Sequence, residues 1–421
     1  MTKQSDQIIE TLFRTEYGKL LAILTRYFGT SYIQLAEDVV QETLISALNS
    51  WSTSGIPDNP TGWLVQVAKR KAFNELKRNK MIQDHHDSLI LKDNTTSEIG
   101  AIYLEDEIKD SQLRMIFTCC HSSLDIKSQI ALTLKTLCGF GVKEVANALL
   151  TSESTINKRL YRAKEKIRNS NVPFNIPQGL ELNEKLDTVE LTLYLLFNEG
   201  YNSSTGESVI QKELCLEAIR LTKLLVDHFE NSAKLNALLS LMCFHTARFD
   251  ARLDDNGAII LFEDQNRALW SQDMIDIGMK YFKKSIHLNE LSPYHIEARI
   301  AAEHCLAKNF DATNWQVIYD QYLLLAKLKP NPIIKLNLAI IESKLHGIET
   351  SLNRLQKLSR NADLKNYHLL PATQGIFSMK LGRYKEAINF LNKSLKLKPS
   401  IRERAFIEDK ISECKKLLPT K

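Results

Sequence analysis

The sequence has few of the residues and runs that mark secreted, membrane or β-rich proteins. Of its 421 residues only 15 are glycine and 10 are proline, and helix-favouring residues are abundant, which argues against an all-β fold. No run of about 18 apolar residues is present, so we expect no membrane-spanning helix. The first residues, MTKQSDQIIE, lack the apolar segment of a signal peptide. We therefore expect a cytoplasmic protein with no membrane contact.

Cysteine occurs in a pattern that favours neither disulfides nor a metal site. The run Cys119-Cys120-His121 contains zinc-ligand side chains, but adjacent cysteines lack the usual knuckle spacing and no second pair follows. We expect no metal site and seven reduced, mostly buried thiols, because an odd number of scattered cysteines suits a reducing compartment. They are Cys119, Cys120, Cys138, Cys215, Cys243, Cys305 and Cys414.

Recognisable catalytic motifs are missing as well. The sequence has no glycine-rich phosphate loop, no G-x-S-x-G nucleophile turn and no His-Glu-x-x-His pair. Segments 196–207 and 262–267 carry several polar side chains, but a structural turn explains them more simply than a ligand site. We expect a protein that is not an enzyme and that holds no cofactor.

Residues 142–168, VKEVANALLTSESTINKRLYRAKEKIR, predict two short helices joined by a turn, with a strongly basic second helix. Ser152 is a suitable N-cap for that helix, and its polar face can meet phosphates and base edges. The helix also has an apolar stripe, made of Ile156, Leu160, Ala163 and Ile167. The pattern is typical of a DNA-binding helix-turn-helix, although a helical hairpin with a solvated basic face would share it.

A second basic element lies nearer the N-terminus. Residues 69–80 contain six lysines or arginines and a single acid, and apolar residues recur on one side of the predicted helix. Residues 81–110 reverse this balance, with eight acidic and two basic residues. We expect 81–110 to be an extended acidic linker between two basic modules. The net charge of +5 is modest, but its distribution along the chain suits nucleic-acid binding.

The segment before this basic element predicts a helix over residues 35–48. Trp51 and a loop rich in Ser, Thr, Gly, Asn and Pro follow it. The helix would carry an acidic and amide-bearing patch beside an apolar one, and the patch consists of Glu37, Asp38, Gln41 and Glu42. Such a patch suits a basic protein partner better than nucleic acid.

In this order the pieces resemble regions 2 and 4 of an extracytoplasmic-function (ECF) sigma factor of bacterial RNA polymerase. The resemblance rests on AEDVVQETLISALNSW, PTGWLVQVAKRKAFNELKR and the helix-turn-helix, and it covers about Leu12 to Arg168. It implies a region 2-like domain at 8–80, the linker at 81–110 and a region 4-like domain at 111–170. The implied partners are promoter DNA and core RNA polymerase, bound through its β′ clamp and β flap.

The resemblance also implies roles for individual residues. The acidic helix would bind the polymerase clamp through Asp38, Gln41 and Glu42. The −10 element would be contacted by Trp51, Lys69, Arg70, Lys71, Asn74, Lys77 and Arg78. The −35 element would be contacted by Ser154, Thr155, Asn157, Lys158, Arg159 and Arg162. Arg70, Asn74 and Leu150 stand where the family often has Asn, Asp and Gly, so its base preferences and its turn geometry do not carry over.

The rest of the chain, from about residue 171, predicts a series of amphipathic helices. Pro173 and Pro177 mark a break after the helix-turn-helix. The predicted helices then cover 188–199, 212–229, 233–247, 274–288, 296–307, 315–327 and 333–344. Offsets typical of a tetratricopeptide repeat occur near the end, at Gly375, Gly382, Ala387, Leu391 and Pro399. We expect residues 171–421 to form a solenoid of such helical hairpins.

Together these features predict an all-α protein with two small helical sigma domains, the second a helix-turn-helix, followed by an α-helical solenoid. The whole chain resembles the ECF subgroup that carries a C-terminal tetratricopeptide-like domain, which takes the place of a separate anti-sigma protein. This implies promoter-specific initiation modulated by the fused domain, whose concave surface could hold a protein partner. The alternative is a helix-turn-helix regulator whose solenoid senses a ligand or a protein. The acidic helix and the Trp51 loop argue against it, because such a regulator has no need of them.

Overall fold

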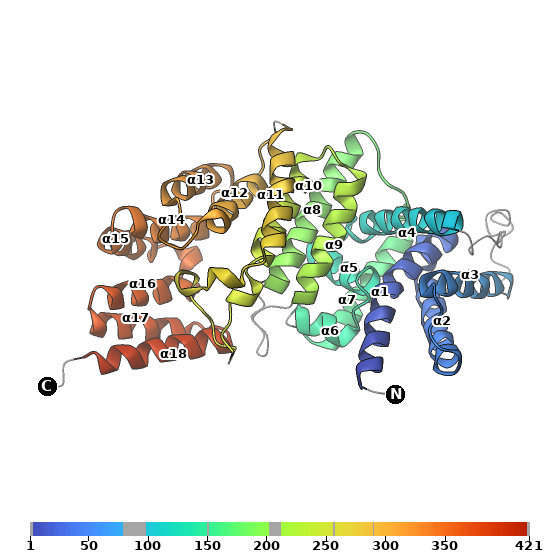
Figure 1. Cartoon of the computed structure of the whole chain (residues 1–421), viewed down its shortest axis with the longest axis horizontal. Helices are drawn as coiled ribbons and strands as arrows, with labels where there is room; N and C mark the ends of the chain where they lie inside the picture. The colour runs from blue at the N-terminus through green and yellow to red at the C-terminus, as the bar shows by residue number, and fades with distance from the viewer. Residues whose placement is uncertain are drawn as a thin grey trace. The chain divides into compact units, whose positions relative to one another are not determined.

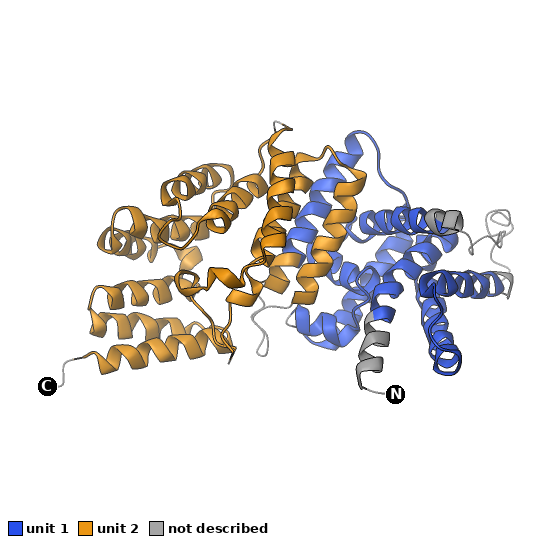
Figure 2. Ribbon diagram, viewed as in Figure 1, with its two compact units in different colours: residues 1–196 blue, residues 197–421 orange. Residues whose placement is uncertain are grey.

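The chain is built of helices (Figure 1). Its structure is a computed structural model that describes residues 3–78, 98–149, 151–201, 212–255, 257–288 and 290–418. Eighteen α-helices occur in these ranges, where the single strand-like pairing is a bridge between Leu253 and Ile259. The all-α prediction is confirmed. The chain divides into two compact units, residues 1–196 and 197–421, with the division inside α8 (Leu180–Tyr201) (Figure 2).

Four long helices form the first part of the N-terminal unit. α1 (Lys3–Phe28) packs against α2 (Ile33–Ser54), α3 (Pro60–Arg78) and α4 (Glu98–Cys119). The middle of α1 supplies much of the core because successive apolar residues there face three neighbouring helices. The fully buried residues of this stretch are Leu20, Leu21, Ala22, Ile23 and Leu24.

α4 begins inside the segment that the sequence predicts as an acidic linker. Leu104 and Ile108 are buried, so apolar residues at helical spacing outweigh the acidic composition of 98–110. The predicted linker is therefore too long at its C-terminal end, and residues 81–97 lie outside the described residues.

Cys119 and Cys120 stand at the end of α4, and both are buried. The Cys119 Sγ lies 3.0 Å from Thr136 Oγ1, and the Cys120 Sγ lies 3.9 Å from Thr133 Oγ1. Burial raises the pKa of the Cys120 thiol to about 11. Both side chains therefore act as buried, protonated thiols in a helical core.

The second part of the N-terminal unit contains the predicted helix-turn-helix. α5 (Ile126–Thr136), α6 (Val142–Ala148) and α7 (Glu153–Asn169) pack against one another. The N-cap prediction is confirmed, because Ser152 Oγ accepts a hydrogen bond from the Thr155 backbone N–H at 3.2 Å. Leu150, which stands in the turn where the family often has glycine, lies outside the described residues.

Two glycines let the two parts of this unit touch backbone to backbone. A Cβ atom at Gly18 of α1 would lie 2.1 Å from the carbonyl oxygen of Leu137. Gly139 has a φ of +70°, and a Cβ atom there would lie 2.5 Å from the carbonyl oxygen of Arg14. Any other residue at these positions would push α1 away from the segment between α5 and α6.

The C-terminal unit is a succession of helices that mostly pack against their sequence neighbours. α10 (Ala233–Thr246) is buried on nearly all sides and packs against α9 (Lys212–His228), α11 (Gln272–Ile286) and α12 (Pro293–Leu306). The later helices are α13 (Trp315–Leu328), α14 (Pro332–Leu345), α15 (Ile348–Leu358), α16 (Leu369–Lys380), α17 (Tyr384–Lys396) and α18 (Ile401–Lys416). All seven helices predicted after residue 171 are present, and the largest difference is the earlier start of α8.

α16 and α17 cross closely at Gly375 and Ala387. A Cβ atom at Gly375 would lie 2.6 Å from Leu391 Cγ, so only glycine lets α17 pack this closely. Ala387 and Leu391 are fully buried in the pair. Gly382 has a φ of +74°, which allows the tight turn between the two helices.

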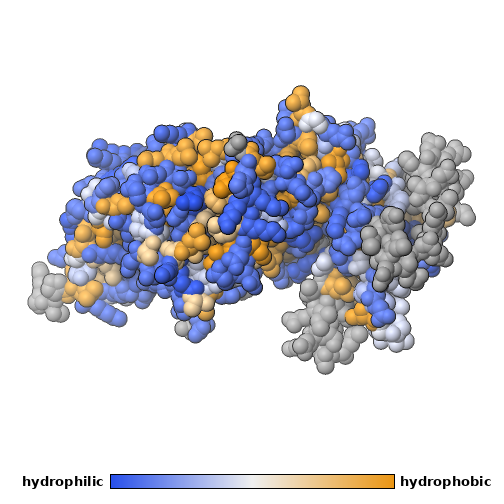
Figure 3. Space-filling view, turned by 45° about the horizontal axis from the view of Figure 1, so that its top comes forward, coloured by the Kyte–Doolittle hydropathy of each residue, from blue (hydrophilic) through white to orange (hydrophobic). Residues whose placement is uncertain are grey.

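The face drawn in Figure 3 is mostly hydrophilic, with hydrophobic residues in separate groups. In the part of the chain that the structure describes, no helix combines the length and apolar character needed to cross a bilayer.

Candidate polymerase and DNA interfaces

The basic face of α7 is open to solvent. Its buried stripe, predicted from the sequence, consists of Ile156, Leu160, Ala163 and Ile167. Five of the six residues predicted to contact the −35 element are exposed, namely Ser154, Thr155, Asn157, Lys158 and Arg162. A helix anchored on one side and polar on the other can enter a major groove.

Arg159, the sixth predicted residue, is half-buried near the start of α5. Asp125 caps α5 there, and its carboxylate accepts hydrogen bonds from the Ser128 hydroxyl at 2.6 Å and the Ser128 backbone N–H at 3.1 Å. These bonds, with a further contribution from the Arg159 charge, hold the pKa of Asp125 below its usual value. Arg159 thus has an electrostatic partner within the protein, which leaves Arg162 as the more accessible guanidinium.

α2 presents the predicted polymerase-binding residues on one exposed face. Asp38, Gln41 and Glu42 are all exposed. Ile45 and Leu48 continue the same stripe, with 57% and 45% of their surface exposed. Large apolar side chains beside carboxylates on an open helix face are typical of a surface that another protein covers.

Glu37 is not part of this face, although the sequence places it in the acidic patch. Its side chain is only 4% exposed and forms an ion pair with Lys164 of α7, which is 14% exposed. Lys164 Nζ also donates to Gln34 Oε1 at 3.2 Å. The helix expected to bind polymerase and the helix expected to bind DNA are therefore joined through their buried sides.

The basic residues of α3 divide between internal ion pairs and solvent. Lys69 Nζ lies 2.9 Å from Glu107 Oε2 and 5.1 Å from the centre of the Tyr27 ring. Lys71 Nζ lies 3.4 Å from Glu42 Oε2. Both lysines are thus paired with carboxylates of neighbouring helices.

Arg70, Asn74, Lys77 and Arg78 are the other residues of α3 predicted for the −10 contact. Arg70 and Asn74 are exposed. The side chains of Lys77 and Arg78 lie outside the described residues. Among the residues predicted for this contact whose side chains the structure describes, Arg70 and Asn74 are therefore the exposed ones.

Trp51, predicted to contact the −10 element, is a packing residue in this structure. Its side chain is only 6% exposed. Its ring centre lies 5.9 Å from that of Phe13 and 5.4 Å from that of Trp63. A base cannot stack on a ring enclosed in this way, because the large apolar indole at the end of α2 is already covered by aromatic side chains of α1 and α3.

Three family models match segments of this chain. Sigma-70 region 2 matches residues 12–81, and sigma-70 region 4 matches residues 114–167. A family of unknown function, DUF6596, matches residues 185–286. The first two matches cover the helices that carry the faces described above, so the fold and these faces define a sigma-70-type initiation factor.

Proteins with similar sequences indicate which type of sigma factor this chain is. Uncharacterized protein R00370 of Rhizobium meliloti is 33% identical over 389 residues, which cover 92% of this chain and 91% of the relative. The ECF RNA polymerase sigma-E factor of Haemophilus influenzae is 28% identical over 41% of this chain and 92% of its own length. RNA polymerase sigma factor YlaC of Bacillus subtilis is 26% identical over 38% of this chain and 90% of its own length. This chain belongs to the ECF-type sigma factors, which direct promoter-specific transcription. It also carries an additional helical unit, and the match to the Rhizobium protein extends over that unit as well.

Proposed function

We propose that this sigma factor binds core RNA polymerase through the exposed face of α2, made of Asp38, Gln41, Glu42, Ile45 and Leu48, and that it acts in the cytoplasm. The observation that carries the proposal is the mixed character of this face. Carboxylates there can pair with basic side chains of the polymerase clamp, and the apolar residues add area that becomes buried on binding.

For promoter DNA we propose two surfaces. Arg70 and Asn74 of α3 would contact the −10 region. The exposed face of α7, with Arg159 at its edge, would contact the −35 element. Support comes from the exposure of the α7 side chains and from their position near the N-terminus of the helix, which is the part of a recognition helix that reaches base edges.

Charge reversal on α2 tests the polymerase contact. Asp38→Arg combined with Glu42→Arg should abolish binding to core polymerase on native gels, because like charges would then face each other. Ser50→Arg is a matched control on the exposed end of the same helix, off the face that carries Asp38 and Glu42, and it should bind as the unchanged protein does. Binding of the double variant at the unchanged affinity would remove this face from the proposal.

We also propose that the C-terminal unit is tetratricopeptide-like and controls the activity of the sigma regions in the same chain. A unit fused to its target is held at a high effective concentration, so weak contacts can mask or complete a binding surface. Ending the chain after Tyr201 should change promoter activity several-fold in a reporter assay at matched protein levels, while core binding persists. Equal activity under inducing and non-inducing conditions would contradict this role.

A further inference from the structure

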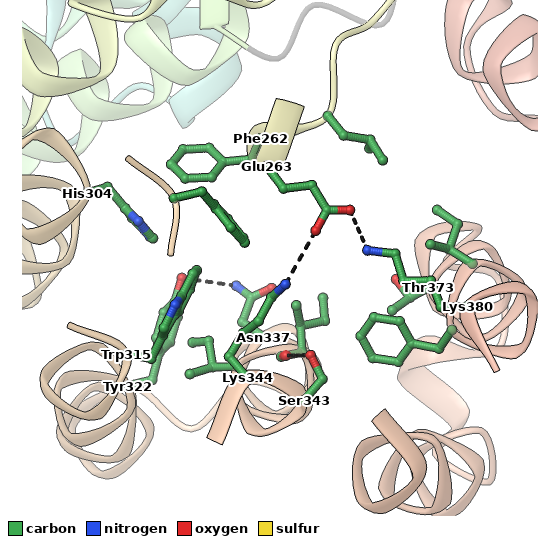
Figure 4. A pocket seen from close by; sticks show the side chains of 16 residues that line it. Phe262, Glu263, His304, Trp315, Tyr322, Asn337, Ser343, Lys344, Thr373 and Lys380 are labelled. Carbon is green, nitrogen blue, oxygen red and sulfur yellow. Dashed lines mark hydrogen bonds and ion pairs between the residues drawn. The ribbon is translucent and has the colours of Figure 1, made fainter. Parts of the chain in front are cut away.

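The C-terminal unit contains an open cavity of about 310 Å³. It lies among α13, α14, α16 and the loop before α11, and Figure 4 shows the side chains that line it. Its volume is near the lower end of the range of roughly 300–1,000 Å³ that is usual for sites of small organic ligands. The cavity therefore has room for a small molecule.

The rim of this cavity is cationic. Lys344 of α14 and Lys380 of α16 both form ion pairs with one carboxylate, that of Glu263, and the Lys344 Nζ–Glu263 Oε2 distance is 3.3 Å. Figure 4 shows Glu263 pointing between the two lysines from the loop above them. Two ammonium groups share a single carboxylate here, so the rim carries one positive charge more than Glu263 balances.

The floor of the cavity is largely apolar. Its lining includes Trp315 and Tyr322 of α13, Ile340 of α14 and Ile376 of α16. Asn337 Nδ2 lies 3.5 Å from the Tyr322 hydroxyl, so the lining also contains one polar pair. An apolar body can be buried here while an anionic head remains at the lysines.

We propose that this cavity binds a monocarboxylate with an apolar acyl or aryl body. The carboxylate would pair with Lys344 and Lys380, and the body would lie on the floor beside Trp315, Ile340 and Ile376. Glu263 already shows that both lysines reach a carboxylate placed at this point. One further negative charge neutralises the rim, whereas a polyanion would face repulsion from Glu263 and an uncharged ligand would leave the excess cation unmatched.

Decanoate, below its micelle-forming concentration, is a direct probe of this site in the full-length chain. We expect saturable binding at one site by titration calorimetry, and binding at least about tenfold weaker for decanol and for decyltrimethylammonium. Lys380→Met should weaken decanoate binding about tenfold because a charge-assisted hydrogen bond is lost. Lys335→Met, an exposed lysine on the outer side of α14, should leave binding unchanged.

Glu263→Gln separates binding from a merely structural effect. Removing the competing carboxylate should make decanoate bind several-fold more tightly, whereas a loss of local structure would weaken it. Equal binding of decanol, or no response to either Lys380→Met or Glu263→Gln, would overturn the proposal. So would binding of a peptide with the chain's own sequence ILFEDQ in the absence of decanoate binding, which would make the groove a peptide site. This binding needs neither polymerase nor DNA, so its failure leaves the assignment of the sigma regions untouched.

Discussion

Lys164 of the recognition helix forms an ion pair with Glu37 of α2, a carboxylate that the fold buries almost completely. A buried carboxylate depends on its partner, because the cost of removing it from water is recovered only while the cation is present. The pair therefore links the stability of the N-terminal unit to the contact between α7 and the first turns of α2.

Removing the cation should destabilise the protein. Lys164→Met leaves Glu37 buried without a cation, and we expect the free energy of unfolding to fall by about 2–3 kcal/mol in urea titrations. The double variant Glu37→Gln with Lys164→Met should recover much of this loss, since no charge remains to be buried. Lys166→Met, at an exposed position of α7, is the control. Equal urea midpoints for Lys164→Met and Lys166→Met would mean that the pair contributes nothing measurable.

The same contact cannot persist if both promoter elements are bound as proposed. The −10 and −35 elements are roughly 25 base pairs apart, or roughly 85 Å along B-form DNA at 3.4 Å per base pair. Glu37 and Lys164 belong to the two parts that would occupy these elements, and here they touch. The N-terminal unit must therefore open on the promoter, and the free energy of opening lowers the apparent affinity for DNA.

Arg162 should be the most sensitive position of the recognition face. Arg162→Ala removes an exposed guanidinium, and we expect a loss of about 1–3 kcal/mol in binding of the cognate promoter by the holoenzyme, with unchanged binding to core polymerase. Arg159→Ala should have a smaller effect because Arg159 is half-buried beside Asp125. Arg168→Ala, at the far end of α7, is the control. Promoter binding by Arg162→Ala that matches this control across a range of salt would place the DNA on another face.

The C-terminal unit should lose stability in mild acid. Burial, with a smaller contribution from neighbouring arginines, lowers the pKa of both His245 and His304 to about 3. In the unfolded chain these side chains take up protons near pH 6.5, whereas the folded unit does not until about pH 3. The unfolded state therefore binds more protons in this window, and stability falls as the pH falls through it.

We expect each of these histidines to remove about 2 kcal/mol of stability between pH 7 and pH 5. Urea titrations followed by tryptophan fluorescence can measure this loss. His245→Phe combined with His304→Phe should reduce it, while His295, whose pKa is also lowered by burial, keeps part of it. His287→Gln changes an exposed histidine and should leave the loss of stability between pH 7 and pH 5 unchanged. The pKa of Glu403 is lowered to about 2, mainly by its contact with His368, so this carboxyl takes up protons only below about pH 4.5, outside the window from pH 7 to pH 5. An unchanged pH profile in the double variant would show that other groups govern the acid response.

Local patterns made most of the helices predictable. The Ser152 cap and the apolar stripe of α7 follow from spacing within a few residues, and so does the glycine between α16 and α17. The pairing of Glu37 with Lys164 does not, because it joins residues 127 positions apart and depends on the tertiary fold of the N-terminal unit. Trp51 shows the converse difficulty, since an aromatic residue beside a polar loop gives no local sign of whether its ring is covered.

The Lys69–Glu107 pair changes how the charge of α3 is to be counted. Affinity for DNA that arises from counterion release depends on the number of cations that reach phosphates, and each such contact contributes roughly 0.9 to the slope of log affinity against log salt. Lys69 is occupied by a carboxylate and an aromatic ring of the same unit, so it adds little to that number. The salt sensitivity of this helix on DNA is therefore set by fewer cations than the sequence of residues 69–80 contains.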